Sequence, residues 1–103
     1  MILITGSLVA RPETAAELFA LSRAHCVRSR AEDGCIKHTV HLDADDPLRL
    51  VFIEHWRDSA AVMKHFADTH ARTFSKAVVR LSARPPTLEI YEANEIGIKG
   101  LAS

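Results

Sequence analysis

Residues 52–70, FIEHWRDSAAVMKHFADTH, bring together side chains that can move protons, bind metals or hold an aromatic ligand. The stretch contains three of the six histidines of the chain, its only tryptophan and a glutamate. Histidine can act as a general base near neutral pH, and neutral imidazole also binds transition metals and haem iron. The stretch is therefore compatible with a catalytic pocket, a metal site, a haem site, or a helix that simply packs on a strand.

His65 and His70 are the predicted catalytic residues of this stretch. Each lies on the apolar face of a predicted helix, because His65 shares a face with Val62 and Phe66, and His70 shares one with Phe74. Burial lowers the pKa of a histidine and keeps the ring neutral, so that it can accept a proton. The structural alternative is a core histidine whose ring bonds a backbone carbonyl.

Trp56 and Glu54 share one face of a predicted strand, and His55 faces the other way. An indole N–H can donate to an oxyanion and its ring can stack on a planar substrate, although Trp56 can equally be a large core residue. A carboxylate on an apolar strand face needs a partner, for example an arginine of a second subunit. We therefore expect Glu54 to have a structural role.

The residues predicted to bind a substrate are His38, Trp56, Phe66, Phe74 and Tyr91. His38 alternates with apolar residues in its predicted strand and therefore faces an apolar layer, where it lines a pocket or fills the core. Tyr91 lies in the last predicted strand and can present its hydroxyl group to a ligand, although a strand tyrosine is more often half-buried packing.

The spacing of the histidines along the chain argues against a metal site. His65 and His70 are five residues apart, which places them about 140° out of register on a continuous helix, unlike the i, i+4 pair of an HExxH motif. His38 and His41 are three residues apart on a strand and therefore lie on opposite faces. We predict that no metal binds, although histidines from distant segments can still converge in the fold.

The elements that must position these residues follow the order β-α-β-β-α-α-β. Strands are predicted over residues 2–9, 35–42, 48–56 and 87–93, and helices from Pro12 to about Ala31, over 59–67 and over 70–82. This order predicts an α+β, ferredoxin-like split βαβ fold with a four-stranded antiparallel sheet and helices on one face. We expect residues 1–96 to form one domain, followed by a C-terminal tail at 97–103.

Charge and hydropathy argue against several classes of protein, among them nucleic-acid binders and membrane proteins. The 103 residues carry 13 Lys+Arg and 13 Asp+Glu, so there is no basic field that would attract a nucleic acid. The apolar start has no basic region before it and soon meets Arg11 and Pro12, which favours a strand over a signal peptide or a membrane span. We therefore expect a cytoplasmic protein in which Cys26 and Cys35 are free thiols. Because 48% of this short chain is hydrophobic, we also expect a partner subunit.

The order of elements and the residues together resemble the antibiotic biosynthesis monooxygenase (ABM) domain of the dimeric α+β barrel group. The resemblance covers roughly residues 1–94 and rests on RPETAAELFAL after the first strand, on EDGCIKHTVHLDADDPLRLVFIEHWRDSAAVMKHFADTHARTFSKAVVRL, and on PPTLEIYE. Its most specific features are the Glu-x-Trp that ends the third strand, the acid–Ser–x–Ala helix start, and the pair His65 and His70. The resemblance implies a homodimer with face-to-face sheets and a pocket between sheet and helices in each subunit.

Characterised relatives in this family include cofactor-free monooxygenases that act on phenolic polyketides and quinols. The resemblance implies a cofactor-independent monooxygenase that oxidises a small phenolic or quinol-type substrate with O2, with His65, aided by His70 or His38, as the base. Such an enzyme needs a base, donors for the oxyanion and a dry apolar pocket, but no metal or flavin motif. The alternatives are an isomerase or decarboxylase that uses the same pocket, and a non-catalytic stress-response module that binds a small ligand.

Haem degradation is not expected from the residues at the matching positions. The resembling haem-degrading enzymes carry an asparagine on the first strand, a tryptophan on the short helix and a histidine ten residues later. Here the first strand has no asparagine, and the other two positions hold His65 and Ser75.

Overall fold

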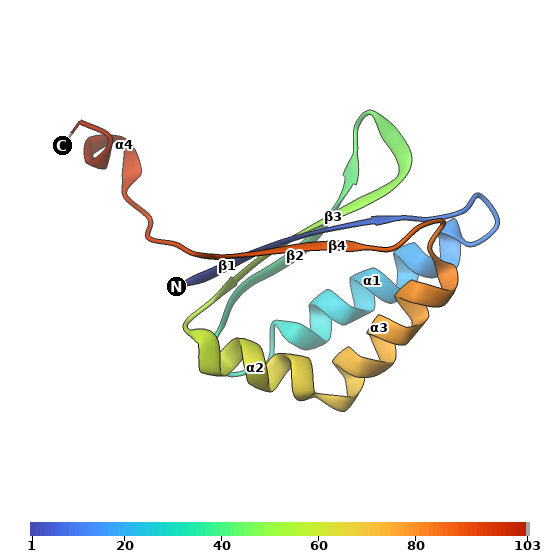
Figure 1. Cartoon of the computed structure of the whole chain (residues 1–103), viewed down its shortest axis with the longest axis horizontal. Helices are drawn as coiled ribbons and strands as arrows, with labels where there is room; N and C mark the ends of the chain where they lie inside the picture. The colour runs from blue at the N-terminus through green and yellow to red at the C-terminus, as the bar shows by residue number, and fades with distance from the viewer. Residues whose placement is uncertain (103) are drawn as a thin grey trace.

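The computed structural model describes residues 1–102 and contains a four-stranded sheet with three helices on one of its faces (Figure 1). The strands are β1 (Ile2–Val9), β2 (Cys35–Asp43), β3 (Asp46–Trp56) and β4 (Thr87–Glu92). The helices are α1 (Ala15–Ser29), α2 (Ser59–Ala67) and α3 (Thr69–Leu81), and a four-residue helix α4 (Gly97–Gly100) follows β4. The predicted α+β, ferredoxin-like fold is confirmed.

All neighbouring strands are antiparallel, in the order β2-β3-β1-β4. In this register His38 of β2 lies opposite Glu54 of β3, Glu54 lies opposite Ile4 of β1, and Ile4 lies opposite Ile90 of β4. Cross-strand partners point to the same side of a sheet. The four residues therefore form one row across the sheet, on the side that faces the helices.

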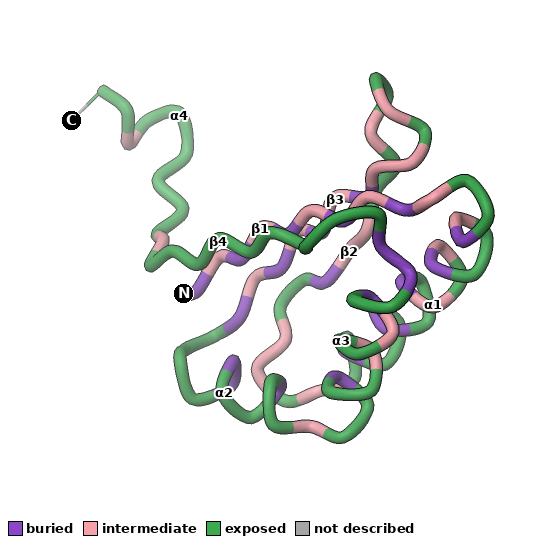
Figure 2. Tube along the Cα trace, turned by 45° about the vertical axis from the view of Figure 1, so that its right-hand side comes forward, coloured by how far each residue is buried: buried purple, intermediate pink, exposed green. Residues whose placement is uncertain are grey.

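The buried residues of β1 and β3 alternate with half-buried ones, as the repeating colours along both strands show (Figure 2). One core cluster surrounds Phe52 and Leu18, where α1 and α3 pack on the sheet. A second cluster contains Trp56 and Ile4 and includes two residues of α2. By contrast, every residue of the edge strand β4 is exposed. The sheet is thus anchored to the helices mainly by its inner strands.

The connection from α1 to β2 depends on a glycine. Gly34 has a φ angle of +88°, a conformation that residues with a side chain rarely adopt. A Cβ atom on Gly34 would also lie 2.5 Å from the Cβ atom of Ala61 in α2. Because Gly34 has no side chain, this connection can pack directly against α2, and it carries Glu32 towards that helix. Asp58 fixes the start of α2, because its carboxylate accepts a hydrogen bond from the backbone N–H of Ala61 at 2.9 Å.

Three departures from the predicted helix and strand boundaries bear on the fold. Helix α1 begins at Ala15 rather than Pro12, because Thr14 forms a turn in which its hydroxyl group accepts from the Arg11 N–H and donates to the Leu81 carbonyl. Strand β3 begins at Asp46, so the β2–β3 turn is shorter than predicted. The predicted tail contains α4, and its last residue, Ser103, lies outside the described residues.

Within residues 1–102, no helix is both long and apolar enough to cross a bilayer.

Candidate functional site

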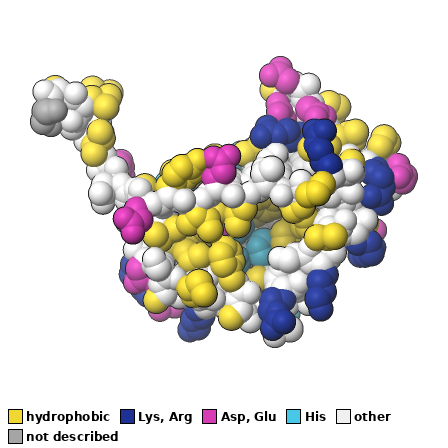
Figure 3. All heavy atoms as spheres, viewed as in Figure 1, with side chains coloured by type: hydrophobic (Ala, Val, Ile, Leu, Met, Phe, Trp, Pro, Cys, Tyr) yellow, Lys and Arg dark blue, Asp and Glu magenta, His cyan; other side chains and the backbone are white. Residues whose placement is uncertain are grey.

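A cavity of about 390 Å³ opens between the sheet and the helices, a volume typical of small-molecule sites. Most of its wall is apolar and comes from α3, with further residues from β1, β3 and β4 and with Phe66 from α2. The ionisable side chains in the wall are His25, Glu54 and His65. Figure 3 shows a histidine at the bottom of a hollow that is bordered by hydrophobic side chains. The cavity thus combines an apolar wall with a few groups able to exchange protons.

His65 is held in one orientation by Glu32. Its Nδ1 atom lies 3.0 Å and 2.9 Å from the two carboxylate oxygens of Glu32, and the histidine side chain is almost completely buried. A carboxylate can only accept, so Nδ1 carries the proton and donates it. In the neutral ring, the other nitrogen, Nε2, then has a lone pair that can accept a proton from a ligand in the cavity that His65 lines.

Glu54 lies on the sheet side of the cavity and contacts two neighbours. Its Oε1 atom accepts a hydrogen bond from Trp56 Nε1 at 2.9 Å and lies 3.2 Å from His38 Nε2, which is not aligned with it as a hydrogen-bond donor. Burial is the largest influence on the pKa of Glu54 and raises it, but the contact with His38 and the Trp56 hydrogen bond outweigh it. The pKa of Glu54 is therefore lowered, which favours a carboxylate in this wall.

His25 completes a group of three buried histidines with His38 and His65. Its ring stacks on Phe74, with 4.2 Å between the ring centroids and 11° between the planes. Burial, followed by the nearby His38 and His65, lowers the pKa of His25 to about 3. His25 is therefore neutral at physiological pH.

The shifted pKa of His25 predicts how the stability of metal-free protein depends on pH. Its ordinary pKa of 6.5 applies to the unfolded chain, so between pH 6.5 and about 3 the unfolded state binds the additional proton. Stability therefore falls as the pH decreases through this window, by up to about 1.4 kcal/mol per pH unit from this group. We expect urea unfolding between pH 6.5 and 5 to show this loss, and a smaller loss in His25→Phe. Equal slopes in the two proteins would contradict the assignment.

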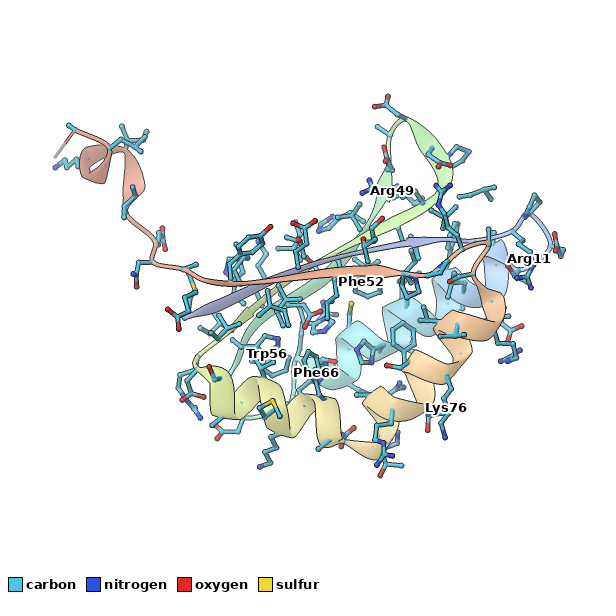
Figure 4. All side chains as sticks on the ribbon, viewed as in Figure 1. Arg11, Arg49, Phe52, Trp56, Phe66 and Lys76 are labelled. Atoms are coloured by element: carbon cyan, nitrogen blue, oxygen red, sulfur yellow. The ribbon has the colours of Figure 1, made fainter. Side chains whose placement is uncertain are left out.

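Three of the predicted site residues lie in the cavity wall, namely His65, Phe66 and Phe74. His38 and Trp56 are fully buried behind Glu54 and do not contribute to the wall. Figure 4 shows Phe52 and Trp56 pointing from β3 towards the helices, into the space that Phe66 approaches from α2. Because the Trp56 N–H already bonds Glu54, this residue supports the wall instead of stacking on a ligand.

The structure separates His70 and Tyr91 from the cavity. His70 is exposed in the first turn of α3, so the prediction that it lies on the buried face of that helix is wrong. Asp68 caps the start of α3, and its carboxylate accepts a hydrogen bond from the His70 N–H at 2.9 Å. The buried face of the helix is therefore formed by other residues. Tyr91 pairs with Leu3 on the sheet face away from the helices, where its hydroxyl group donates to Glu89.

Neither His25 nor Glu32 is among the site residues predicted from the sequence. The signal for His25 was present, because Leu18, Ser22 and His25 follow each other at helical spacing and all are buried. No sequence signal links Glu32 to His65, since 33 residues separate them. The prediction that no metal binds considered spacing along the chain, and the fold brings together histidines from three different elements.

The two cysteines are free thiols, as predicted. Cys26 is buried, and its burial raises the pKa of its thiol to about 12, whereas Cys35 is only half-buried. The sulfur of Cys26 lies 3.2 Å from Nδ1 of His38.

Comparison with known proteins agrees with the fold and the resemblance. The solved structure of a candidate antibiotic biosynthesis monooxygenase from Deinococcus radiodurans matches with a TM-score of 0.88 and 30% identity, over 92% of this chain and 94% of its own. Rv0793 from Mycobacterium tuberculosis matches with a TM-score of 0.87 and 26% identity, over 93% of this chain and 97% of its own.

A curated relative and a family model complete the comparison. The uncharacterized protein sll1783 of Synechocystis is 31% identical over 94 residues, which are 91% of this chain but 64% of that protein. The chain thus spans less than two thirds of the length of this relative. The model of the antibiotic biosynthesis monooxygenase domain matches residues 1–77. The chain therefore belongs to the ABM family.

Proposed function

We propose that the protein is a cofactor-independent monooxygenase that oxidises a small phenolic or quinol-type substrate with O2 in this cavity. The observation that carries the proposal is His65, a base in the wall of an apolar cavity whose Nδ1 is held by both oxygens of Glu32. Family membership supports the monooxygenase class, and the apolar wall suits an aromatic substrate.

In this reaction the main task of the protein is to remove a proton from the substrate, and a base can do this without a cofactor. Ground-state O2 is a triplet and reacts slowly with a closed-shell phenol, whereas a phenolate or enolate can pass an electron to it. For a quinol that becomes a hydroxyquinone, the substrate loses four electrons to one O2. One oxygen atom then enters the product and the other leaves as water. The protein must remove the first proton and keep bulk water away from the reactive anion.

The cavity supplies both requirements through a few residues. Nε2 of His65 would take the substrate proton, and Glu32 would stabilise the resulting imidazolium through Nδ1. Phe66 and Phe74 would enclose the aromatic ring and exclude water. Glu54, held by Trp56, would support the wall at the polar end of the cavity. In this assignment His65 and Glu32 act together as the base.

The proposal is tested by oxygen uptake with chelator-treated protein and a panel of quinols, naphthols and anthrones, each run in air and under anaerobic conditions. We expect at least one compound to be consumed in air together with O2 and to remain unchanged without it. Substrate consumption that continues without O2 would point to the isomerase or decarboxylase alternative. Saturable binding without any product would point to the non-catalytic ligand-binding module.

The proposal includes a homodimer formed through the sheet face that lies away from the helices. In Figure 1 the helices α1, α2 and α3 all lie on the other face of the sheet. Its half-buried side chains include Leu3, Val51 and Ile53, with Tyr91 from β4 beside them. Burial of such a surface against a second copy would stabilise a chain that is too short to bury all of its apolar area.

We therefore expect light scattering at micromolar concentration to give twice the mass of one chain. Ile53→Lys places a charge in the centre of the open face and should shift the mass towards that of a monomer. The matched control is Val27→Lys on the exposed side of α1, which should leave the dimer intact. A monomer in the wild type, or equal masses in the two variants, would contradict this interface.

A further inference from the structure

His25, His38 and His65 converge from α1, β2 and α2 at the inner end of the cavity. Their relative exposures are 6%, 0% and 3%, and one ring nitrogen from each lies within 4.8 Å of the others. Buried histidines in a protein core usually satisfy both ring nitrogens with hydrogen bonds. Because three buried histidines contact one another here, we ask which groups their ring nitrogens bind.

Packing against aromatic neighbours accounts for the burial of these histidine rings, but it does not give every ring nitrogen a hydrogen-bond partner. His25 stacks on Phe74, and His65 packs against Trp56 with 4.6 Å between the ring centroids. However, Nε2 of His38 is buried without an aligned hydrogen-bond partner among residues 1–102. In the same part of the chain, the ring nitrogens of His25 form no hydrogen bond with another residue. With its proton on Nδ1, the side that faces Cys26, the His38 ring therefore has a free lone pair at Nε2, and the neutral His25 ring has one as well.

The separation of the three rings matches that of a tri-histidine metal centre. The ring centroids lie 5.1 Å (His25 to His38), 5.3 Å (His25 to His65) and 5.6 Å (His38 to His65) apart. Three imidazoles bound to one tetrahedral zinc ion at about 2.0–2.1 Å would place their centroids about 5.2 Å apart. The rings thus have the required spacing, and metal binding would require their nitrogens, now within 4.8 Å of one another, to turn towards a common centre.

The groups around the cluster resemble those that orient metal ligands. Glu32 accepts from Nδ1 of His65, which leaves Nε2 for a metal ion. Nδ1 of His38 lies 3.2 Å from the sulfur of Cys26, on the opposite side of the ring from the unaligned Nε2. The carboxylate of Glu54 lies 3.2 Å from that Nε2 atom and provides negative charge beside the three neutral ligands.

We propose that His25, His38 and His65 form a binding site for one first-row divalent metal ion of the zinc and cobalt class, with Glu54 as the nearest carboxylate. Imidazole is a preferred ligand of these ions, and a site with three protein nitrogens leaves a position open towards the cavity. The ion would bind Nε2 of His65, which is the atom that takes the substrate proton in the proposed oxidation. Metal binding is therefore expected to inhibit that reaction, and this consequence alone depends on the proposed function.

The site is tested with CoCl2, because tetrahedral cobalt(II) absorbs visible light and zinc does not. Chelator-treated protein is titrated with CoCl2 while the visible spectrum is recorded. We expect absorption that saturates at one cobalt per chain and disappears when ZnCl2 is added. His25→Phe keeps the stacking on Phe74 but removes a ligand, and it should weaken cobalt binding about 100-fold or more. His65→Gln should do the same, which guards against misfolding of one variant, and circular dichroism checks both folds.

The matched control is His41→Asn, which removes an exposed histidine of β2 and should leave cobalt binding unchanged. Absence of cobalt binding at millimolar concentration, or equal binding by His25→Phe and wild type, would overturn the proposal. The two proposals fail separately: oxygen uptake without cobalt binding removes only the metal site, and cobalt binding without any turnover removes only the oxidation. Stoichiometric ZnCl2 should abolish oxygen uptake, and an increase in uptake would overturn the inhibitory role.

Discussion

His65→Ala is expected to reduce oxygen uptake by about 10²- to 10⁴-fold, the usual contribution of a positioned general base. The variant removes the ring nitrogen that would take the substrate proton, while the other residues of the cavity wall remain. Glu32 loses its partner, but it is partly exposed and can be solvated, so we expect the fold to survive. The measurement is the initial rate of oxygen uptake with a substrate found in the panel, together with a far-ultraviolet circular dichroism spectrum.

The matched control for this prediction is His70→Ala, which removes the exposed histidine five residues later. Its rate should stay within about two-fold of the wild type, because His70 lies outside the cavity wall. Glu32→Gln should lower kcat and leave KM nearly unchanged, since Glu32 touches His65 and does not line the cavity. Undiminished turnover in His65→Ala, or equal losses in the two histidine variants, would remove His65 from its role.

Trp56→Ala is expected to lower the free energy of unfolding by about 3–5 kcal/mol, the range measured for large aromatic residues in protein cores. Trp56 is fully buried, packs against His65, and donates to the Glu54 carboxylate. The substitution leaves a void and also removes the hydrogen bond of a buried charge. For a domain whose total stability is about 5–15 kcal/mol, this is a large share.

Urea unfolding followed by circular dichroism measures this loss, because the substitution removes the only tryptophan and its fluorescence. Trp56→Phe should cost about 1–3 kcal/mol, because it keeps most of the ring but loses the hydrogen bond to Glu54. Met63→Ala is the control, since Met63 lies on α2 with 66% exposure and should change stability by less than about 0.5 kcal/mol. Equal midpoints for Trp56→Ala and Met63→Ala would contradict the supporting role assigned to Trp56.

The fold could be predicted because its signals are local. The alternating pattern of β1 and β3 and the breaks at Gly34 and at Pro85-Pro86 define where elements begin and end, and the order of elements then limits the topology. The error at the start of α1 has a local cause as well. The hydroxyl group of Thr14 bonds Arg11 within the turn and Leu81 at the end of α3, and no neighbouring sequence reveals the second partner.

The site could be predicted only where one element decides the direction of a side chain. The helical period of α2 placed His65 on the buried face, and the two-residue period of β3 placed Glu54 and Trp56 together. Contacts between side chains of different elements could not be predicted in this way. The pairing of Glu32 with His65 depends on the close approach of Gly34 to Ala61, which only the folded chain shows.

His70 illustrates the opposite error. The spacing of His70 and Phe74 predicts a shared apolar face, but Asp68 caps α3 and sets the rotation of its first turn, so that His70 points to solvent. The three-histidine cluster was out of reach for a similar reason. Its members come from three elements and no two of them share a short spacing, so a search for ligand pairs along the chain does not find it.

The most direct test of the proposed oxidation is the fate of isotopically labelled oxygen. Chelator-treated protein is incubated with ¹⁸O2 and the best substrate of the panel, and the product is analysed by mass spectrometry. A cofactor-independent monooxygenase predicts one ¹⁸O atom in each product molecule, no labelled product with His65→Ala, and no product without O2. A product of unchanged mass, or one that forms equally well without O2, would contradict the proposal and leave the isomerase or decarboxylase reaction in its place.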